Sequence, residues 1–186
     1  MPSPSATTIV SPRLTIRLVT AADLPGLLVV NGDAAVTRHL PYATWQTLSD
    51  ADAWFERMRV LGDAGTAWQF VICDTATGQV LGSCLLFRFD AGSARAELGY
   101  ALGRAHWGRG LMFEALGALL THAFDGLGLR RIEAEVNPAN TASVRLLERL
   151  GFTREGVLRQ RWVAKGAAYD VNFYGLLRSE WPAAAA

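Results

Sequence analysis

The chain has 186 residues, 51% of them hydrophobic, which predicts one domain with a core of normal size. Its 18 Lys and Arg residues and 17 Asp and Glu residues give a formal net charge of +1, which argues against a broad electrostatic grip on nucleic acid. Two cysteines supply no disulfide framework, and no histidine stands at ligand spacing from another His or Cys. We therefore expect no metal site.

The sequence shows no membrane or export signal. No apolar run reaches about 18 residues, the length of a membrane span, and the N-terminal residues lack the apolar core of a signal peptide. The expected location is the cytoplasm. We expect a single domain over residues 11–181, with residues 1–10 and 182–186 loosely held, as chain ends commonly are.

The first half of the chain alternates short apolar patterns with polar turns. Residues 13–18 alternate apolar and polar positions, as a half-buried strand does. A helix is expected over 21–31 and an amphipathic one over 49–61, with an irregular aromatic segment at 37–45 between them. Three strands are then expected, at residues 68–74, 79–89 and 94–102.

The second half predicts helices interleaved with strands. A glycine turn opens a helix over 110–126, a strand follows at 131–136, and another helix covers 141–150. The chain closes with a hairpin of strands 153–163 and 168–177. This order indicates a mixed α/β fold with a largely antiparallel sheet and flanking helices.

Residues 96–113, A-E-L-G-Y-A-L-G-R-A-H-W-G-R-G-L-M-F, lead from a strand through a glycine turn into a helix. The first NH groups of a helix lack partners and lie at the positive end of its dipole, and Gly108 and Gly110 leave room for a phosphate oxygen to reach them. The only lysine, Lys165, lies too far downstream for a Walker loop, and a dinucleotide fingerprint lacks its third glycine. The turn predicts a pyrophosphate-containing cofactor, with a ligand-free helix start as the alternative.

Residues 137–152, N-P-A-N-T-A-S-V-R-L-L-E-R-L-G-F, predict a polar turn and a helix that Asn140 caps and Gly151 ends. Together with E-L-G-Y, W-G-R-G, E-G-V-L-R and the late Y-D-V-N-F-Y, they resemble the GNAT superfamily of acetyl-CoA-dependent N-acetyltransferases, and within it the RimJ/RimL-like branch. The resemblance spans about residues 12–181. It implies the GNAT acyltransferase fold, with two helices after the first of seven strands, one after the fourth and one after the fifth.

The resemblance implies where acetyl-CoA binds. The pantetheine arm would lie beside the backbone of Tyr100, Ala101 and Leu102, where the family opens a V between its fourth and fifth strands. Asn140 would contact this arm, cap its helix, or do both. The pyrophosphate would bind the backbone of the turn, formed by Trp107, Gly108, Arg109, Gly110, Leu111 and Met112. Met112 departs from the Gly or Ala of the family, and its long side chain would weaken CoA binding unless it faces the core.

The resemblance also directs attention to catalytic groups. Many GNAT enzymes protonate the CoA thiolate with a Tyr seven residues after the Asn, where this chain has Leu147. Ser143 is the candidate instead, as a hydrogen-bond donor to sulfur, and a local bond within its helix turn is the alternative. Glu97 is the candidate general base, with a plain salt bridge as its alternative role. Glu155 and Asp170 are rivals as the base or as anchors for the substrate ammonium.

The acceptor is the least specified partner. Tyr42, Trp45, Trp68 and Trp162 are candidates to line its slot, with core packing as the alternative for each. The branch implies the α-amine of a protein N-terminus, such as that of a ribosomal protein. Direct attack in a ternary complex is expected, because no cysteine lies in either cofactor motif. A small amine (polyamine, amino acid or antibiotic) is the second hypothesis, and a non-catalytic acyl-CoA-binding module is the third. A monomer and a homodimer both remain open.

Overall fold

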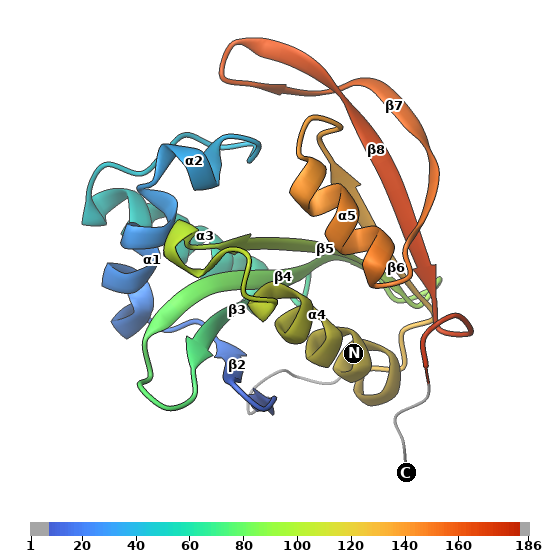
Figure 1. The fold of residues 1–186 in the computed structure, drawn as a ribbon, viewed down its shortest axis with the longest axis horizontal. Coiled ribbons are helices and arrows are strands. Elements are labelled where there is room, and N and C mark those ends of the chain that lie inside the picture. The colour runs from blue at the N-terminus through green and yellow to red at the C-terminus, as the bar shows by residue number, and fades with distance from the viewer. Residues whose placement is uncertain (1–7, 183–186) are drawn as a thin grey trace.

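The structure, a computed structural model, describes residues 8–182, which contain one eight-stranded sheet (Figure 1). The strands lie in the order β1-β2-β3-β4-β5-β6-β8-β7, and every neighbouring pair is antiparallel except β5 and β6. Their bounds are β1 Thr8–Val10, β2 Leu14–Leu18, β3 Ala67–Asp74, β4 Val80–Asp90, β5 Arg95–Leu102, β6 Arg131–Val136, β7 Thr153–Ala164 and β8 Ala167–Leu177. The predicted mixed α/β class with a largely antiparallel sheet is confirmed.

Helices cover both faces of this sheet. They are α1 Leu24–Asn31, α2 Ala34–Thr37, α3 Leu48–Asp63, α4 Leu111–Thr121 and α5 Thr141–Arg149. Successive residues of a strand point to opposite faces. Phe70 and Ile72 of β3 accordingly join the main core with α4 and α5, whereas Val71 and Cys73 join a second core with α1 and α3.

Three element predictions need correction. Thr8–Val10, expected to be loosely held, pairs with β2 as an edge strand, while residues 1–7 and 183–186 lie outside the described residues. The helix expected over 21–31 begins as a 3-10 turn, because Asp23 caps the backbone NH of Thr20 at 2.8 Å. The helix expected over 110–126 is α-helical to Thr121 and then widens into a π-helical turn, His122–Gly126.

The sheet opens between β5 and β6. These parallel strands pair only at Arg95↔Arg131, Ala96↔Ile132 and Glu97↔Glu133, whereas β5 stays paired with β4 as far as Leu102. The remaining backbone of β5 on this side is therefore free of β6. The V that the family resemblance implied is present, and it begins immediately after Glu97.

Candidate functional site

A cavity of about 900 Å³ occupies this gap and reaches both faces of the sheet. Leu98 and Tyr100 line it from the α4 and α5 side, and Glu97 and Gly99 line it from the other. The predicted site residues that it brings together are Tyr42, Glu97, Tyr100, Ala101, Leu102, Trp107, Gly108, Gly110, Leu111, Met112, Asn140, Ser143 and Trp162. The gap thus joins the predicted cofactor half to the predicted acceptor half.

The glycine turn is open to an anion. Gly108 and Gly110 have φ of +72° and +73°, a left-handed conformation that costs other residues free energy, and Gly110 caps the N-terminus of α4. A Cβ on Gly108 would meet no atom within 4 Å, and one on Gly110 would meet only the Arg13 guanidinium, at 3.8 Å. The backbone NH groups that begin α4 therefore remain approachable, as phosphate binding requires.

A side chain from the other end of the chain braces this turn. Arg13 donates to the carbonyl of Arg109 at 3.1 Å and pairs with Glu114 of α4 at 2.6 Å. The carbonyl of Arg109 faces this brace, and Arg109 is the one residue of the turn, Trp107 to Met112, that does not line the cavity. The sequence analysis missed Arg13, because nothing in a strand pattern tells which distant loop its exposed side chain contacts.

Two bulky side chains near the turn have defined packing. The indole of Trp107 donates to the carbonyl of Leu102 at 2.7 Å, which ties the turn to the end of β5. Met112 is only 7% exposed and packs in the main core with Leu116 and Leu119. Its long side chain faces the interior, the arrangement in which it was expected to leave the cofactor turn unobstructed.

A pair of hydroxyls, one from the start of α5 and one from β5, faces the cavity. The Asn140 side chain accepts from the backbone NH of Ser143 at 3.2 Å, so the predicted N-cap is confirmed. The Ser143 hydroxyl lies 2.6 Å from the hydroxyl of Tyr100 on β5. Burial raises the pKa of Tyr100 to about 12, although its bond to Ser143 acts in the opposite direction. Leu147, one turn further along α5, is buried in the core.

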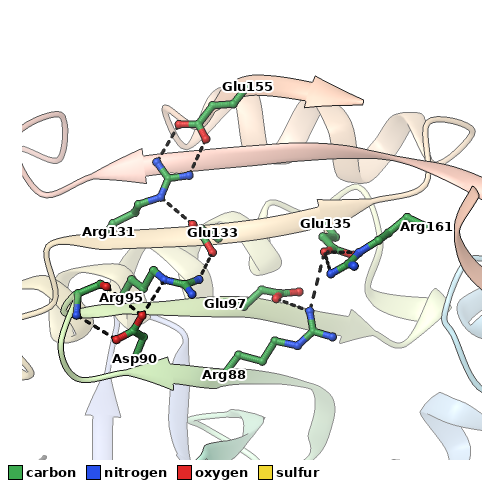
Figure 2. A network of polar contacts seen from close by, with 10 residues as sticks. Arg88, Asp90, Arg95, Glu97, Arg131, Glu133, Glu135, Glu155 and Arg161 are labelled. Atoms are coloured by element: carbon green, nitrogen blue, oxygen red, sulfur yellow. Dashed lines mark hydrogen bonds and ion pairs between the residues drawn. The ribbon is translucent and has the colours of Figure 1, made fainter. Parts of the chain in front are cut away.

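Two buried carboxylates line the other half of the cavity, and Figure 2 shows them within a ladder of ion pairs across the strands. Glu97 is 6% exposed; burial and the nearby Glu133 and Glu135 raise its pKa, whereas the Arg88 guanidinium, 2.7 Å away, opposes this rise. The side chain of Glu135 is 4% exposed and accepts from the Trp162 indole at 2.6 Å and from Arg161 at 3.1 Å.

Glu135 was missed by the sequence analysis. The run R-I-E-A-E-V alternates Glu133 and Glu135 with apolar residues, so both carboxylates share one face of β6. This alternation reads as an ordinary half-exposed strand. The parallel pairing of Glu97 with Glu133 is the information that brings Glu135 beside the open end of β5.

The structure does not bring the two rival carboxylates into the cavity. Glu155 forms a two-pronged pair with Arg131, at 2.8 and 2.5 Å, and this pair lowers its pKa. Asp170 accepts from the backbone NH of Gln160 at 2.8 Å on the exposed hairpin. Neither lines the cavity, so the structure does not bring them beside the acceptor half, where a base or an anchor for the substrate ammonium would lie. Both side chains point to the partners just named instead.

Of the four aromatic residues predicted to line the acceptor slot, two line the cavity and two do not. Trp45 packs against Trp54 with ring centroids 5.4 Å apart, and Trp68 packs against Phe89 at 4.8 Å; both tryptophans are core residues, and their predicted place in the acceptor slot is wrong. Tyr42 lines the cavity and donates to the Asn31 side chain at 2.9 Å. Trp162 lines it with the indole that contacts Glu135.

Other classes of site find no support between residues 8 and 182. No three His, Cys, Asp or Glu side chains in that range gather closely enough to hold a metal ion. None of the helices there combines the length and hydropathy that a membrane crossing requires.

Known proteins share this arrangement. The acetyltransferase (GNAT) domain family matches residues 13–153. An uncharacterized N-acetyltransferase, p20 of Bacillus licheniformis, is 37% identical over 94% of this chain and 98% of its own length. A [ribosomal protein uS5]-alanine N-acetyltransferase of Escherichia coli is 30% identical over 74% of this chain and 75% of its own length.

A solved structure extends the likeness to the fold. RimL, a ribosomal L7/L12 α-N-protein acetyltransferase in complex with coenzyme A, superposes with a TM-score of 0.83 at 24% identity, covering 92% of this chain and 98% of its own. The glycine turn, the open V and the capped α5 are thus found in a chain whose fold and sequence match acetyltransferases. The protein belongs to the GNAT family and is an acetyl-CoA-dependent N-acetyltransferase of the RimJ/RimL-like kind.

Proposed function

We propose that the protein acetylates the α-amine of a protein N-terminus by direct attack on acetyl-CoA in a ternary complex. The observation that carries this proposal is the continuity of the cavity, which runs from the glycine turn through the sheet to Glu97. Cys73 and Cys84 are buried and do not line that cavity, which disfavours a covalent acetyl-enzyme. Acetyl-CoA and the acceptor amine therefore meet without an intermediate carrier.

The cofactor half supports the placement of acetyl-CoA. The pyrophosphate is assigned to the NH groups at the start of α4, beside Gly108 and Gly110. The pantetheine arm is assigned to the backbone of β5 that β6 leaves free, with Asn140 at its side. The thioester then lies in the gap, between Glu97 on one face of the sheet and Ser143 on the other.

The reaction follows from these two groups. Glu97 accepts a proton from the acceptor ammonium, directly or through a water molecule, and the free amine forms a bond to the carbonyl carbon of the thioester. The C–S bond then breaks and its electron pair passes to sulfur, while the surplus proton on the acylated nitrogen passes through water to the thiolate, so that the products are the amide and the CoA thiol. Ser143 donates a hydrogen bond to the departing thiolate without losing its own proton. Because the pKa of Glu97 is raised, this carboxylate is a better base than an exposed glutamate.

The protein acceptor is supported by the 30% identity to an enzyme named as a [ribosomal protein uS5]-alanine N-acetyltransferase. A small amine is the second candidate, and a specific observation favours it. Lys165, at the tip of the β7–β8 hairpin, donates to the carbonyl of Thr37 in α2 at 2.6 Å. The hairpin extends toward α2 on that side of the molecule (Figure 1), and we infer that this contact restricts access to the acceptor half, which Tyr42 and Trp162 line.

A binding module without turnover is the third candidate. Its support in the sequence was Met112 in the turn and the missing tyrosine at Leu147. The packing of Met112 in the core removes the first of these, and a hydroxyl pair at Ser143 offsets the second.

Thiol release from acetyl-CoA tests the proposal, with N-terminal peptides measured beside polyamines, amino acids and aminoglycosides. The expected result is peptide-dependent release that Glu97→Gln slows, while Glu155→Gln, which removes a carboxylate outside the cavity, leaves it unchanged. Release with small amines alone would transfer the proposal to the second candidate. CoA binding without turnover on any acceptor would contradict the catalytic proposal.

A further inference from the structure

Tyr100 faces the cofactor half of the cavity directly across from Ser143. The two hydroxyl oxygens are 2.6 Å apart, a short hydrogen bond between β5 and the first turn of α5. The Tyr100 ring packs against the main core, which holds the phenol in place from behind. This contact joins α5 to the part of β5 that no longer pairs with β6.

The two hydroxyls share one bond, so one of them has to donate. If Ser143 donates to Tyr100, its single proton is used and none remains for the cofactor sulfur. If Tyr100 donates to Ser143, the Ser143 proton is free to point into the cavity. At neutral pH the phenol keeps its proton, because the ordinary pKa of tyrosine, about 10, is far above 7 and burial raises that of Tyr100 further. Its protonated hydroxyl is therefore available as the donor.

Within residues 8–182, the structure records no hydrogen bond from the Ser143 hydroxyl to an acceptor other than Tyr100. The Asn140 side-chain oxygen already accepts from the backbone NH of Ser143. Leu147, the next residue along this face of α5, is apolar and 1% exposed. Among the described residues, Tyr100 is the hydrogen-bond partner that the structure records for the Ser143 hydroxyl.

We propose that Tyr100 is a positioning residue for catalysis. Its hydroxyl donates a hydrogen bond to the Ser143 oxygen, and the Ser143 hydroxyl is thereby oriented to donate its own hydrogen bond to the departing CoA sulfur. The inference rests on the proposed role of Ser143. A hydroxyl that accepts one hydrogen bond donates a stronger one, so Tyr100 also polarises Ser143 toward the thiolate. No proton leaves Tyr100, and the electron balance of C–S cleavage is unchanged.

The test combines Tyr100→Phe, Ser143→Ala and the double variant in single-turnover acetyl transfer, with CoA affinity measured by calorimetry. Tyr100→Phe removes only the hydroxyl, and we expect about a tenfold lower transfer rate with CoA affinity unchanged, the scale of one lost hydrogen bond. Ser143→Ala is expected to slow transfer at least as much. In the Ser143→Ala background, Tyr100→Phe is expected to change the rate by less than about twofold, because Tyr100 acts through Ser143.

A matched control separates this role from a structural one. Tyr174 is a fully buried tyrosine whose hydroxyl donates to Glu148 at 3.3 Å outside the cavity, so Tyr174→Phe loses a comparable bond away from the chemistry. It is expected to leave the transfer rate unchanged. Additive effects of Tyr100→Phe and Ser143→Ala would overturn the inference, as would a Tyr100→Phe enzyme that loses CoA affinity but not transfer rate. If Ser143→Ala has no effect, the proposed role of Ser143 itself fails.

Discussion

Burial raises the pKa of Glu97 and Arg88 lowers it, so the removal of Arg88 tests whether Glu97 is the base. The Arg88 guanidinium donates to the Glu97 carboxylate at 2.7 Å from a residue of β4 with a φ of +52°, where the pairing with β5 is irregular. Such a conformation is costly for a residue other than glycine, and the surrounding structure has to compensate for it. Glu133 and Glu135 face Glu97 from β6 and oppose Arg88 by raising the same pKa.

The size of the effect follows from this geometry. Two unit charges 2.7 Å apart attract by about 1.5 kcal/mol under water-like screening, and we use this limit because the Arg88 side chain is 46% exposed. This free energy corresponds to about one pH unit. Glu97 acts as a base only when it is ionised, so activity rises with pH through its pKa. Arg88→Gln removes the attraction, raises that pKa further and moves the rise to higher pH by about one unit.

The assay is log kcat/KM for one acceptor amine, measured as a function of pH. Arg88→Lys keeps the positive charge and is expected to lie closer to the parent enzyme than Arg88→Gln does. Glu97→Gln identifies which part of the profile belongs to Glu97, because the ionisation of the acceptor amine itself persists in that variant. The reasoning is refuted if Arg88→Gln leaves the rise where it was or moves it to lower pH.

Three further outcomes follow from the structure. Burial alone would raise the pKa of Asp23, but Arg17 and its other partners lower this pKa on balance. Asp23→Asn should therefore destabilise the protein by about 2 to 3 kcal/mol above pH 4, and by less at lower pH, where the carboxyl of the parent protein becomes protonated. Denaturant titrations at several pH values check this. Gly110→Ala should weaken CoA binding about fivefold in calorimetry, because the positive φ of this position costs an alanine about 1 kcal/mol. Gly117→Ala in the same helix, where a Cβ would have no neighbour within 4 Å, should leave CoA binding unchanged. Lys165→Met should loosen the hairpin tip and raise kcat/KM for peptides relative to small amines; an unchanged ratio would show that the tip does not restrict the acceptor.

The cofactor half could be predicted because its signals are local. A glycine that needs positive φ, an Asn that caps a helix and a strand that precedes both are all encoded within a few residues. Gly108, Gly110 and Asn140 take those conformations in the structure. The family resemblance also implied the V between these two strands, and the structure shows where it begins, after Glu97.

The acceptor half could not be predicted in the same way, because its residues come from segments far apart in sequence. Glu135 joins Glu97 only through the parallel pairing of β5 and β6, and Tyr42 reaches the cavity from an irregular loop. Composition does not tell a core tryptophan such as Trp68 from a cavity tryptophan such as Trp162. The partner that satisfies a carboxylate, Arg131 for Glu155, is likewise a tertiary contact.

The short parallel seam also bears on how the chain folds. Strands β1 to β5 lie on one side of this seam and β6, β8 and β7 lie on the other, and each group contains its own long-range pairing, Leu14↔Asp74 between β2 and β3 and Arg131↔Leu177 between β6 and β8. The seam is therefore one of several long-range pairings, and with three residue pairs it is shorter than the β2–β3 and β6–β8 pairings. A ligand in the gap touches both groups. Acetyl-CoA bound in the gap would therefore stabilise the folded sheet by mass action, because it would contact both groups in the folded state.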